Sequence, residues 1–219
     1  MKELLHIFKK QSEIDKIFIE ATSLLEKELT MFQQVTKTLR YSNRSETEID
    51  IKAEDKNINR FQMESRRKIF THLAVSGPEE LSSGLVLMCI LNDVERIGDY
   101  FKNIIELACS HPKKLKGGDI DKNVQQLEKL VIDHFTSTVE AMKKQDIDKA
   151  RKTMKSHLPI TRKVETMLSK LLRNRVGGLN PGEAIALTLY LRFLKRIASH
   201  LTNIASSVVN PLDRIGYSE

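Results

Sequence analysis

The feature that most constrains the fold is an internal repeat. The stretch LNDVERIGDYFKNI (91–104) returns a hundred residues later as LRFLKRIASHLTNI (191–204). The residues that recur at this spacing are Leu87, Leu91, Arg96, Ile97, Asn103 and Ile104, as Leu187, Leu191, Arg196, Ile197, Asn203 and Ile204. Similar heptads alone would give matching apolar positions, but not matching Arg and Asn. We therefore interpret the chain as a duplicated unit.

Each copy reads as three helices. The expected ranges are about 5–40, 46–75 and 76–110 in the first copy, and about 120–144, 147–175 and 180–209 in the second. Ser45 followed by Glu48 has the pattern of a capping box at the start of the second helix. Pro78 and Pro181 stand where a helix prefers to begin. Pro159 is expected to kink the fifth helix or to split off its first turns.

Lys116-Gly117-Gly118-Asp119 is the clearest linker signal in the chain. The sequence therefore predicts an all-α protein of two tandem three-helix bundles, with the first repeat at 1–112, a linker at 113–119 and the second repeat at 120–219. No strand pattern is convincing. No apolar run approaches the roughly 20 residues of a membrane span, and the start has no signal-peptide core. A cytoplasmic location is expected.

Charge is distributed unevenly between the two halves. Residues 1–110 contain 16 Lys and Arg against 18 Asp and Glu, whereas residues 111–219 contain 20 against 11. The basic half indicates an acidic partner, a membrane surface, phosphate or nucleic acid, or simply a solvated basic face. Nucleic acid is not expected, because the basic residues form no recognised binding motif and few aromatic residues lie among them.

Glu95 and Asp99 are the residues that most suggest a binding site. Being four apart on a helix, they present two carboxylates on one face, where like charges repel. Gly98 lies beside them and costs a helix about 1 kcal/mol relative to Ala. Neither feature suits a helix that only packs. A hard cation such as Mg²⁺ or Mn²⁺ would favour the clustered oxygens, and Gly98 would then allow a neighbouring helix to approach closely.

A second pair of ligands would have to come from a facing helix. Asp55 and Asn59 are also four apart, on the second expected helix, and both can supply oxygen. The simpler alternative is that the acids of the third helix only form ion pairs, with Arg96 or Lys102. Spacing alone favours that alternative.

Little in the sequence suggests catalysis. The six histidines form no HExxH motif, and no nucleophile lies beside a base. A di-metal oxidase would need two Glu-x-x-His pairs on facing helices. Only Glu3 and His6 have that spacing, at the chain's start. We therefore do not expect an enzyme.

The stretch from Glu95 to Asp99, ERIGD, followed by Asn103-Ile104, resembles the signature of the PhoU family. The duplicated unit, the DxxIN of Asp55 to Asn59 and the helix-opening prolines agree with it, so the resemblance spans most of the chain. It implies two three-helix bundles side by side, each with a pair of E/DxxxD motifs that bind a metal ion or a small cluster. It also implies non-enzymatic regulation of phosphate transport and phosphate signalling.

The partners that the resemblance implies are a phosphate transporter at the inner membrane face and a sensor histidine kinase. A homodimer is expected because related proteins often dimerise. The alternative function is a cytoplasmic accessory domain of a sodium–phosphate cotransporter. The metal would be iron, zinc, manganese or magnesium.

Carried over residue by residue, the resemblance predicts a metal site in the first repeat only. Its ligands would be Asp55, Asn59, Glu95 and Asp99, with Asn59 in place of an acid.

The second repeat departs from the pattern. Lys195 and Ser199 replace the third-helix acids, Thr161 replaces another, and only Glu165 is kept. A fixed ammonium would repel a metal, so no metal is expected there. Lys195 either pairs with Glu165 or is exposed to water.

Overall fold

The computed structural model describes residues 12–43, 47–76, 78–111 and 113–217. Its long helices are α1 (Glu13–Tyr41), α2 (Ile51–Ser76), α3 (Leu81–Ser110), α4 (Asp121–Lys144), α5 (Ile147–Leu172) and α6 (Pro181–Ser206), with short 3₁₀ turns η1 (Pro78–Glu80), η2 (Gly118–Ile120) and η3 (Leu212–Arg214). The described residues contain no β-strand, and the all-α prediction is confirmed. None of the described helices is long and apolar enough to cross a membrane.

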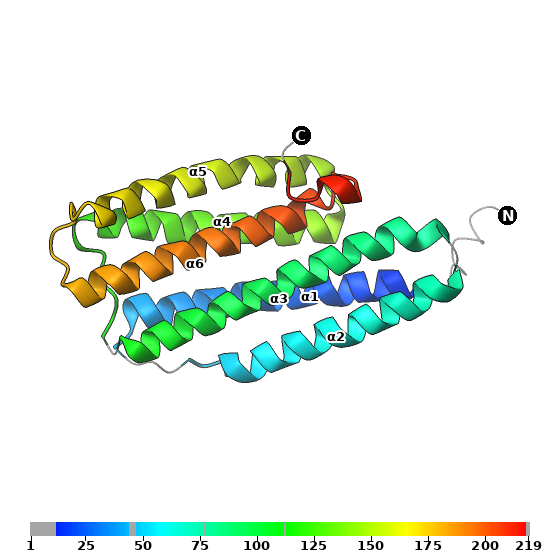
Figure 1. Ribbon diagram of the computed structural model, residues 1–219, viewed down its shortest axis with the longest axis horizontal. Coiled ribbons are helices and arrows are strands. Elements are labelled where there is room, and N and C mark those ends of the chain that lie inside the picture. The colour runs from blue at the N-terminus through cyan, green and yellow to red at the C-terminus, as the bar shows by residue number, and fades with distance from the viewer. Residues whose placement is uncertain (1–11, 44–46, 77, 112, 218–219) are drawn as a thin grey trace.

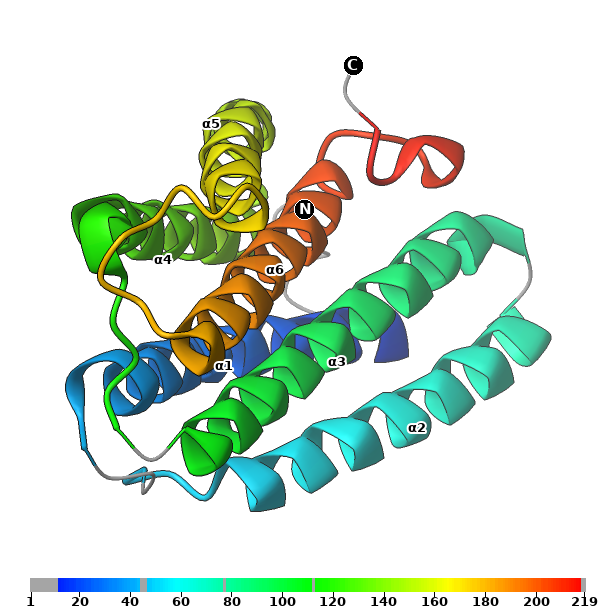
Figure 2. The ribbon, with the colours of Figure 1, turned by 60° about the vertical axis from the view of Figure 1, so that its left-hand side comes forward.

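The helices form two three-helix bundles that lie side by side (Figure 1). Helices α1, α2 and α3 pack together, as do α4, α5 and α6. The bundles meet through α1 against α4 and α3 against α6. Helices α2 and α5 lie on opposite outer sides, as Figures 1 and 2 show. The predicted tandem of six helices is confirmed. In each bundle the outer helix packs against the third helix, α2 against α3 and α5 against α6.

The first helix of each bundle buries the same positions. The buried residues Ala21, Leu25, Glu28, Met31, Phe32, Val35, Thr36, Thr38 and Leu39 of α1 recur, at a shift of 103, as the buried residues Val124, Glu128, Val131, His134, Phe135, Thr138, Val139, Ala141 and Met142 of α4. The repeat-related Phe32 and Phe135 stack on each other with ring centroids 6.3 Å apart. This register shows which residue of one bundle replaces which in the other.

Several helix ends follow local sequence chemistry. Asn180 forms a capping box with Glu183 at the start of α6, and Pro181 is the first helical residue, as predicted. Between α4 and α5, Gln145 adopts the left-handed conformation with a φ of 50°. The side chain of Asp146 then accepts a hydrogen bond from the Lys149 backbone N–H and caps α5.

The predicted start of the second helix was wrong. Helix α2 begins at Ile51 rather than near residue 46, because Asp50 Oδ1 accepts a hydrogen bond 3.0 Å long from the backbone N–H of Ala53. The side chain of Glu48 is engaged elsewhere, accepting from Gln34 Nε2 at 3.3 Å. Residue 45, the other half of the predicted capping box, lies outside the described residues.

The other differences are also at helix ends. Ser12 is extended and caps α1 together with Asp15, so the predicted helix over 5–40 does not continue through residue 12; residues 5–11 lie outside the described part. Helices α5 and α6 each end three residues earlier than expected.

Pro159 does not split α5, which runs unbroken through it and is bowed in Figure 1. Because Pro159 is exposed, water can reach the Lys155 carbonyl that lacks its helical partner.

Candidate functional site

The predicted ligands lie on α2 and α3, which pack against each other in the first bundle. Asp55 is buried on α2, and Asn59 is half-buried one turn further along. Glu95 and Asp99 are half-buried on α3. The negative charges of Asp55 and Asp99 both help to raise the pKa of Glu95, although burial is the largest cause. The spacing argument therefore placed these carboxylates on facing helices correctly.

A lysine stands between the two helices. Lys102 Nζ lies 3.2 Å from Asp55 Oδ2 and 3.0 Å from Asp99 Oδ1, and the hydrogen bond to Asp99 is the main reason that the pKa of Lys102 is raised. Arg96 adds weaker pairs to Glu95 and Asp99, at 3.7 and 3.5 Å. The ion pairs that the sequence offered as the simpler alternative are thus formed.

In this conformation basic side chains contact the carboxylates of Asp55 and Asp99. Among the residues that the structure describes, no three His, Cys, Asp or Glu side chains form a group that could hold a metal ion. The positive charge between the two helices is instead the ammonium of Lys102. The first bundle therefore has an acidic site in which the Lys102 side chain occupies the space between Asp55 and Asp99.

Gly98 is where α3 approaches both neighbouring helices. A Cβ atom at this position would lie 2.9 Å from Ile58 Cδ1 of α2 and 3.5 Å from Glu28 Oε1 of α1. The first distance is shorter than van der Waals contact allows. The interpretation that this glycine permits a close approach is confirmed, and the helix that approaches is the one that carries Asp55.

Glu28 of α1 is the site residue that the sequence analysis missed. Its side chain is fully buried, and neither carboxylate oxygen has a hydrogen-bond partner among the described residues. Burial, and then the charge of Glu95, raise the pKa of Glu28 well above its ordinary value. The sequence did contain a signal, because Glu28 falls on the apolar stripe of α1 between Leu25 and Phe32.

The corresponding place in the second bundle holds a different arrangement. Lys195 of α6 pairs with Glu165 of α5 and lowers the pKa of that carboxyl. The hydroxyls of Thr161 and Ser199 each lie 3.3 Å from His157 Nε2. Of the two alternatives for Lys195, pairing with Glu165 is confirmed. The other two substituted positions, Thr161 and Ser199, contact His157.

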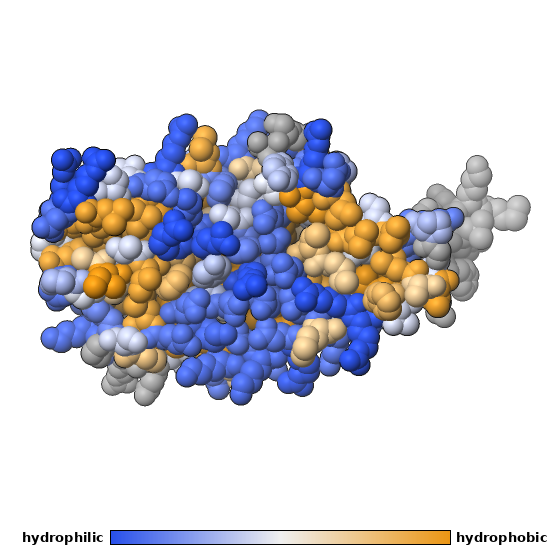
Figure 3. All heavy atoms as spheres, viewed as in Figure 1, coloured by the Kyte–Doolittle hydropathy of each residue, from blue (hydrophilic) through white to orange (hydrophobic). Residues whose placement is uncertain are grey.

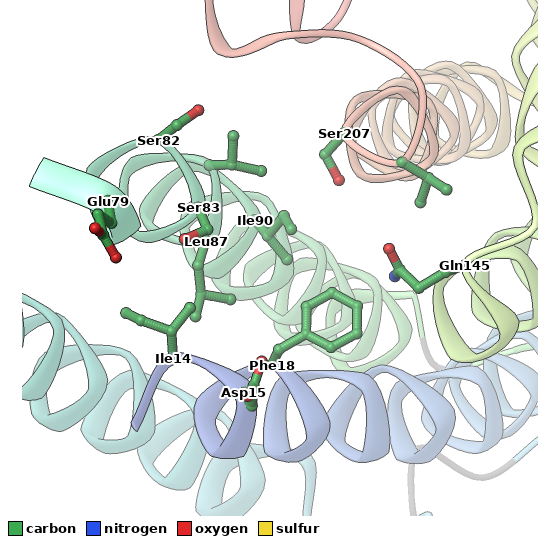
Figure 4. Close-up of a pocket in the computed structure, with 12 residues that line it drawn as sticks. Ile14, Asp15, Phe18, Glu79, Ser82, Ser83, Leu87, Ile90, Gln145 and Ser207 are labelled. Atoms are coloured by element: carbon green, nitrogen blue, oxygen red, sulfur yellow. The ribbon is translucent and has the colours of Figure 1, made fainter. Parts of the chain in front are cut away.

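A hollow lies elsewhere, where the two bundles part. Figure 4 shows this pocket of about 580 Å³ between the start of α1, the start of α3 and the end of α6. Apolar side chains such as Phe18 and Leu87 line it, with the acids Asp15 and Glu79. None of its described lining residues is Lys, Arg or His. The pocket therefore offers no positive charge to an anion such as phosphate.

Comparison with known proteins gives a consistent result. The family model described as the PhoU domain matches residues 21–108 and 124–208. The fold is similar to the phosphate transport system regulatory protein PhoU from Streptococcus pneumoniae, with a TM-score of 0.77 and 18% identity over 90% of this chain and 93% of that one. It is also similar to PhoU from Pseudomonas aeruginosa, with a TM-score of 0.76 and 20% identity over the same shares. No curated protein matches in sequence.

Proposed function

The chain belongs to the PhoU family, since the family model matches both bundles and more than half of the residues, and from that premise we propose that it is a non-enzymatic regulator of phosphate transport and phosphate signalling. It acts in the cytoplasm, at the inner face of the membrane. Its partners are a phosphate transporter and a sensor histidine kinase. The observation that carries this proposal is the duplicated PhoU domain, whose first bundle retains the acids Asp55, Glu95 and Asp99.

A metal ion bound by the first bundle is part of the proposal. Its ligands are Asp55, Asn59, Glu95 and Asp99, all of which offer oxygen, the donor that hard cations such as iron, manganese and magnesium prefer. The contacts of Lys102 support the fit, because a single positive charge there reaches an acid on α2 and an acid on α3. The bound ion would supply a fixed positive charge that holds α2 and α3 together.

Metal content by plasma mass spectrometry tests this part of the proposal. Metal in the wild type that is lost from the Asp55→Ala/Glu95→Ala/Asp99→Ala variant supports the site. No metal in either protein, after incubation with iron, zinc or manganese, contradicts it.

The basic second half is proposed to contact an acidic partner surface or the anionic membrane. Support comes from an open hollow of about 410 Å³ at the end of α5, which Lys170, Arg173 and Arg175 line. Contacts between exposed charges are screened by salt. Partner binding that does not weaken at high ionic strength would contradict this.

A homodimer is also proposed. Figure 3 shows apolar surface at the left of the view, where α6 begins. Ile185 and Leu189 are exposed there and line a hollow with Leu107 of α3. Light scattering of the purified chain tests the proposal, and a monomer at high concentration would contradict it.

Deleting the gene in its native host tests the regulatory function. Phosphate uptake and the output of the sensor kinase are measured in phosphate-rich medium, with and without a plasmid copy of the wild type. We expect both to escape repression in the deletion strain and to return with the wild-type copy. The triple variant in the metal site, expressed at the same level, measures what the site contributes. Unchanged uptake and unchanged kinase output would contradict the proposal.

Crosslinking in the membrane fraction identifies the partner. Recovery of a phosphate importer supports the regulator. Recovery of a sodium–phosphate cotransporter instead would favour the alternative, an accessory domain of such a transporter.

A further inference from the structure

Glu28 of α1 has a buried acidic side chain that no hydrogen bond stabilises among the described residues. Its side chain is 0% exposed to water. Neither of its oxygens has a hydrogen-bond partner among the described residues. A buried polar group without a partner costs stability. A helix that only had to pack would be more stable with an apolar residue at this position.

The direction of the side chain is set by its neighbours. Oε1 of Glu28 lies against Gly98, 3.5 Å from where a Cβ atom would be. Gly98 stands between Glu95 and Asp99 on α3. The charge of Glu95 acts on the Glu28 carboxyl. The carboxylate therefore points from α1 toward the acids of the proposed metal site, across Gly98, which has no side chain to block it.

The second bundle provides an internal comparison. In the register that relates α1 to α4, Val131 stands where Glu28 stands, and it is fully buried. The same bundle has Lys195 and Ser199 in place of the α3 acids. At this position of the first helix, a buried carboxylate is thus present in the copy that retains the facing acids, whereas an apolar residue stands in the copy that has replaced them.

We propose that Glu28 is an additional ligand of the cation in the first bundle, so that the site draws oxygen donors from all three helices, α1, α2 and α3. This inference rests on the metal site of the proposed function. The cation replaces the Lys102 ammonium between Asp55 and Asp99 and gives the Glu28 carboxylate the partner that it lacks. With four carboxylates and an amide, the donor set suits a hard divalent or trivalent ion, such as iron or manganese, better than zinc, which more often takes nitrogen and sulfur ligands.

The test compares matched variants of the full chain. Protein stripped with a chelator is titrated with Mn²⁺ or Fe²⁺, and both bound metal and the metal-dependent rise in melting temperature are measured. Glu28→Gln keeps the shape of the side chain but removes the charge. Glu28→Val introduces the residue of the second bundle and serves if the glutamine variant fails to fold. Glu54→Gln is the control, because Glu54 is a neighbouring α2 acid that pairs with Lys27 at 2.6 Å instead.

We expect both Glu28 variants to bind the metal roughly tenfold or more weakly and to lose most of the metal-dependent rise in melting temperature. Glu54→Gln should match the wild type. Without metal, Glu28→Val should melt no lower than the wild type, since the unpartnered acid is gone. Unchanged metal affinity in the Glu28 variants would overturn this inference and leave the metal site standing. A wild type that binds no metal would overturn both.

Discussion

His134 is a side chain whose protonation the fold disfavours. It is buried on α4, where Nδ1 lies 2.8 Å from Ser156 Oγ and Nε2 lies 3.0 Å from Thr202 Oγ1. Burial, and then the nearby His157, lower its pKa to about 4. In the unfolded chain its pKa returns to about 6.5. Between these two values the unfolded state binds the proton more readily, so stability falls as the pH falls through this range.

The expected contribution of His134 to this loss is about 3 kcal/mol between neutral pH and the folded-state pKa. Urea denaturation at neutral and at mildly acidic pH measures it. His134→Met is the matched control, because Met31 holds the repeat-related position in α1. This variant should lose less stability on acidification, whatever its stability at neutral pH. Equal losses in the two proteins would contradict the assignment.

Sequence reasoning reached the acids of the candidate site and their ion-pair partners Arg96 and Lys102, but not the buried acid that faces them. Spacing alone puts Glu95 and Asp99 on one face of a helix. Whether Lys102 or a metal neutralises them depends on how α2 and α3 pack. Glu28 is far from ERIGD in sequence, and only the packing of α1 on α3 brings it to Gly98. Its place on an apolar stripe was visible, whereas the residue that it faces was not.

Gly98 determines how closely α2 and α3 can pack. In an open helix, replacing Gly by Ala stabilises by about 1 kcal/mol. Here the added methyl group would collide with Cδ1 of the buried Ile58. Overpacking of this kind costs about 1–3 kcal/mol. Because the helix gain offsets part of this cost, we expect Gly98→Ala to lower the free energy of unfolding by up to about 2 kcal/mol, measured by urea denaturation.

A double-mutant cycle separates the contact from other effects. Ile58→Val removes Cδ1, the atom that the new methyl group would meet, and alone costs about 0.5–1.5 kcal/mol. In the Gly98→Ala background it should cost nothing or restore stability, a coupling of about 1 kcal/mol. Strictly additive effects would mean that the two helices adjust their packing freely and that Gly98 is not required for their approach.

Helix existence was easier to predict than helix ends. The starts with a strong local signal, such as Asn180-Pro181 with Glu183, were found because the cap and its partner lie within one turn. The start of α2 was misplaced because two competing caps lie five residues apart. Glu48, one half of the expected capping box, instead accepts a hydrogen bond from Gln34 of α1. No pattern confined to residues 45–51 contains that information.

At the scale of the whole molecule, the pairing of the two bundles was beyond the sequence. All the long helices have an apolar stripe. The stripes alone do not predict which helices form the interface between the bundles, namely α1 with α4 and α3 with α6. Polar contacts lie in the joint, which is the interface of α1 with α4 and of α3 with α6. His200 Nδ1 of α6 lies 2.7 Å from Asp93 Oδ1 of α3, and Asn203 also donates to that oxygen. The other ring nitrogen, His200 Nε2, is buried and has no hydrogen-bond partner among the described residues.

The most buried ion pair between the two bundles, among the described residues, joins Arg40 of α1 and Glu128 of α4. Arg40 Nε lies 2.8 Å from Glu128 Oε1, and the two side chains are 2% and 4% exposed. Tyr190 of α6 and Tyr41 also donate to the Glu128 carboxylate, at 3.1 and 2.7 Å. In the register of the repeat, Glu128 replaces Leu25. One carboxylate therefore organises donors from both bundles.

Replacing Glu128 by its repeat-related residue tests how much the joint depends on this carboxylate. Glu128→Leu leaves a buried guanidinium with only its contacts to Asp121 and the Leu115 carbonyl. Breaking one side of a buried pair costs about 3–5 kcal/mol, which urea denaturation would detect as a lower free energy of unfolding. Arg40→Met in the same protein should recover much of the loss, because two matched apolar residues leave no unpaired charge.

The matched control is Glu26→Gln, which breaks the exposed pair between Glu26 and Lys143, 2.8 Å long. That pair also joins α1 to α4, so it differs from the buried one mainly in its exposure to water. Its loss should cost less than about 1 kcal/mol. If the two single variants lost equal stability, the joint between the bundles would depend on its apolar contacts alone. The buried carboxylate would then fix which surfaces meet without adding to how firmly they hold.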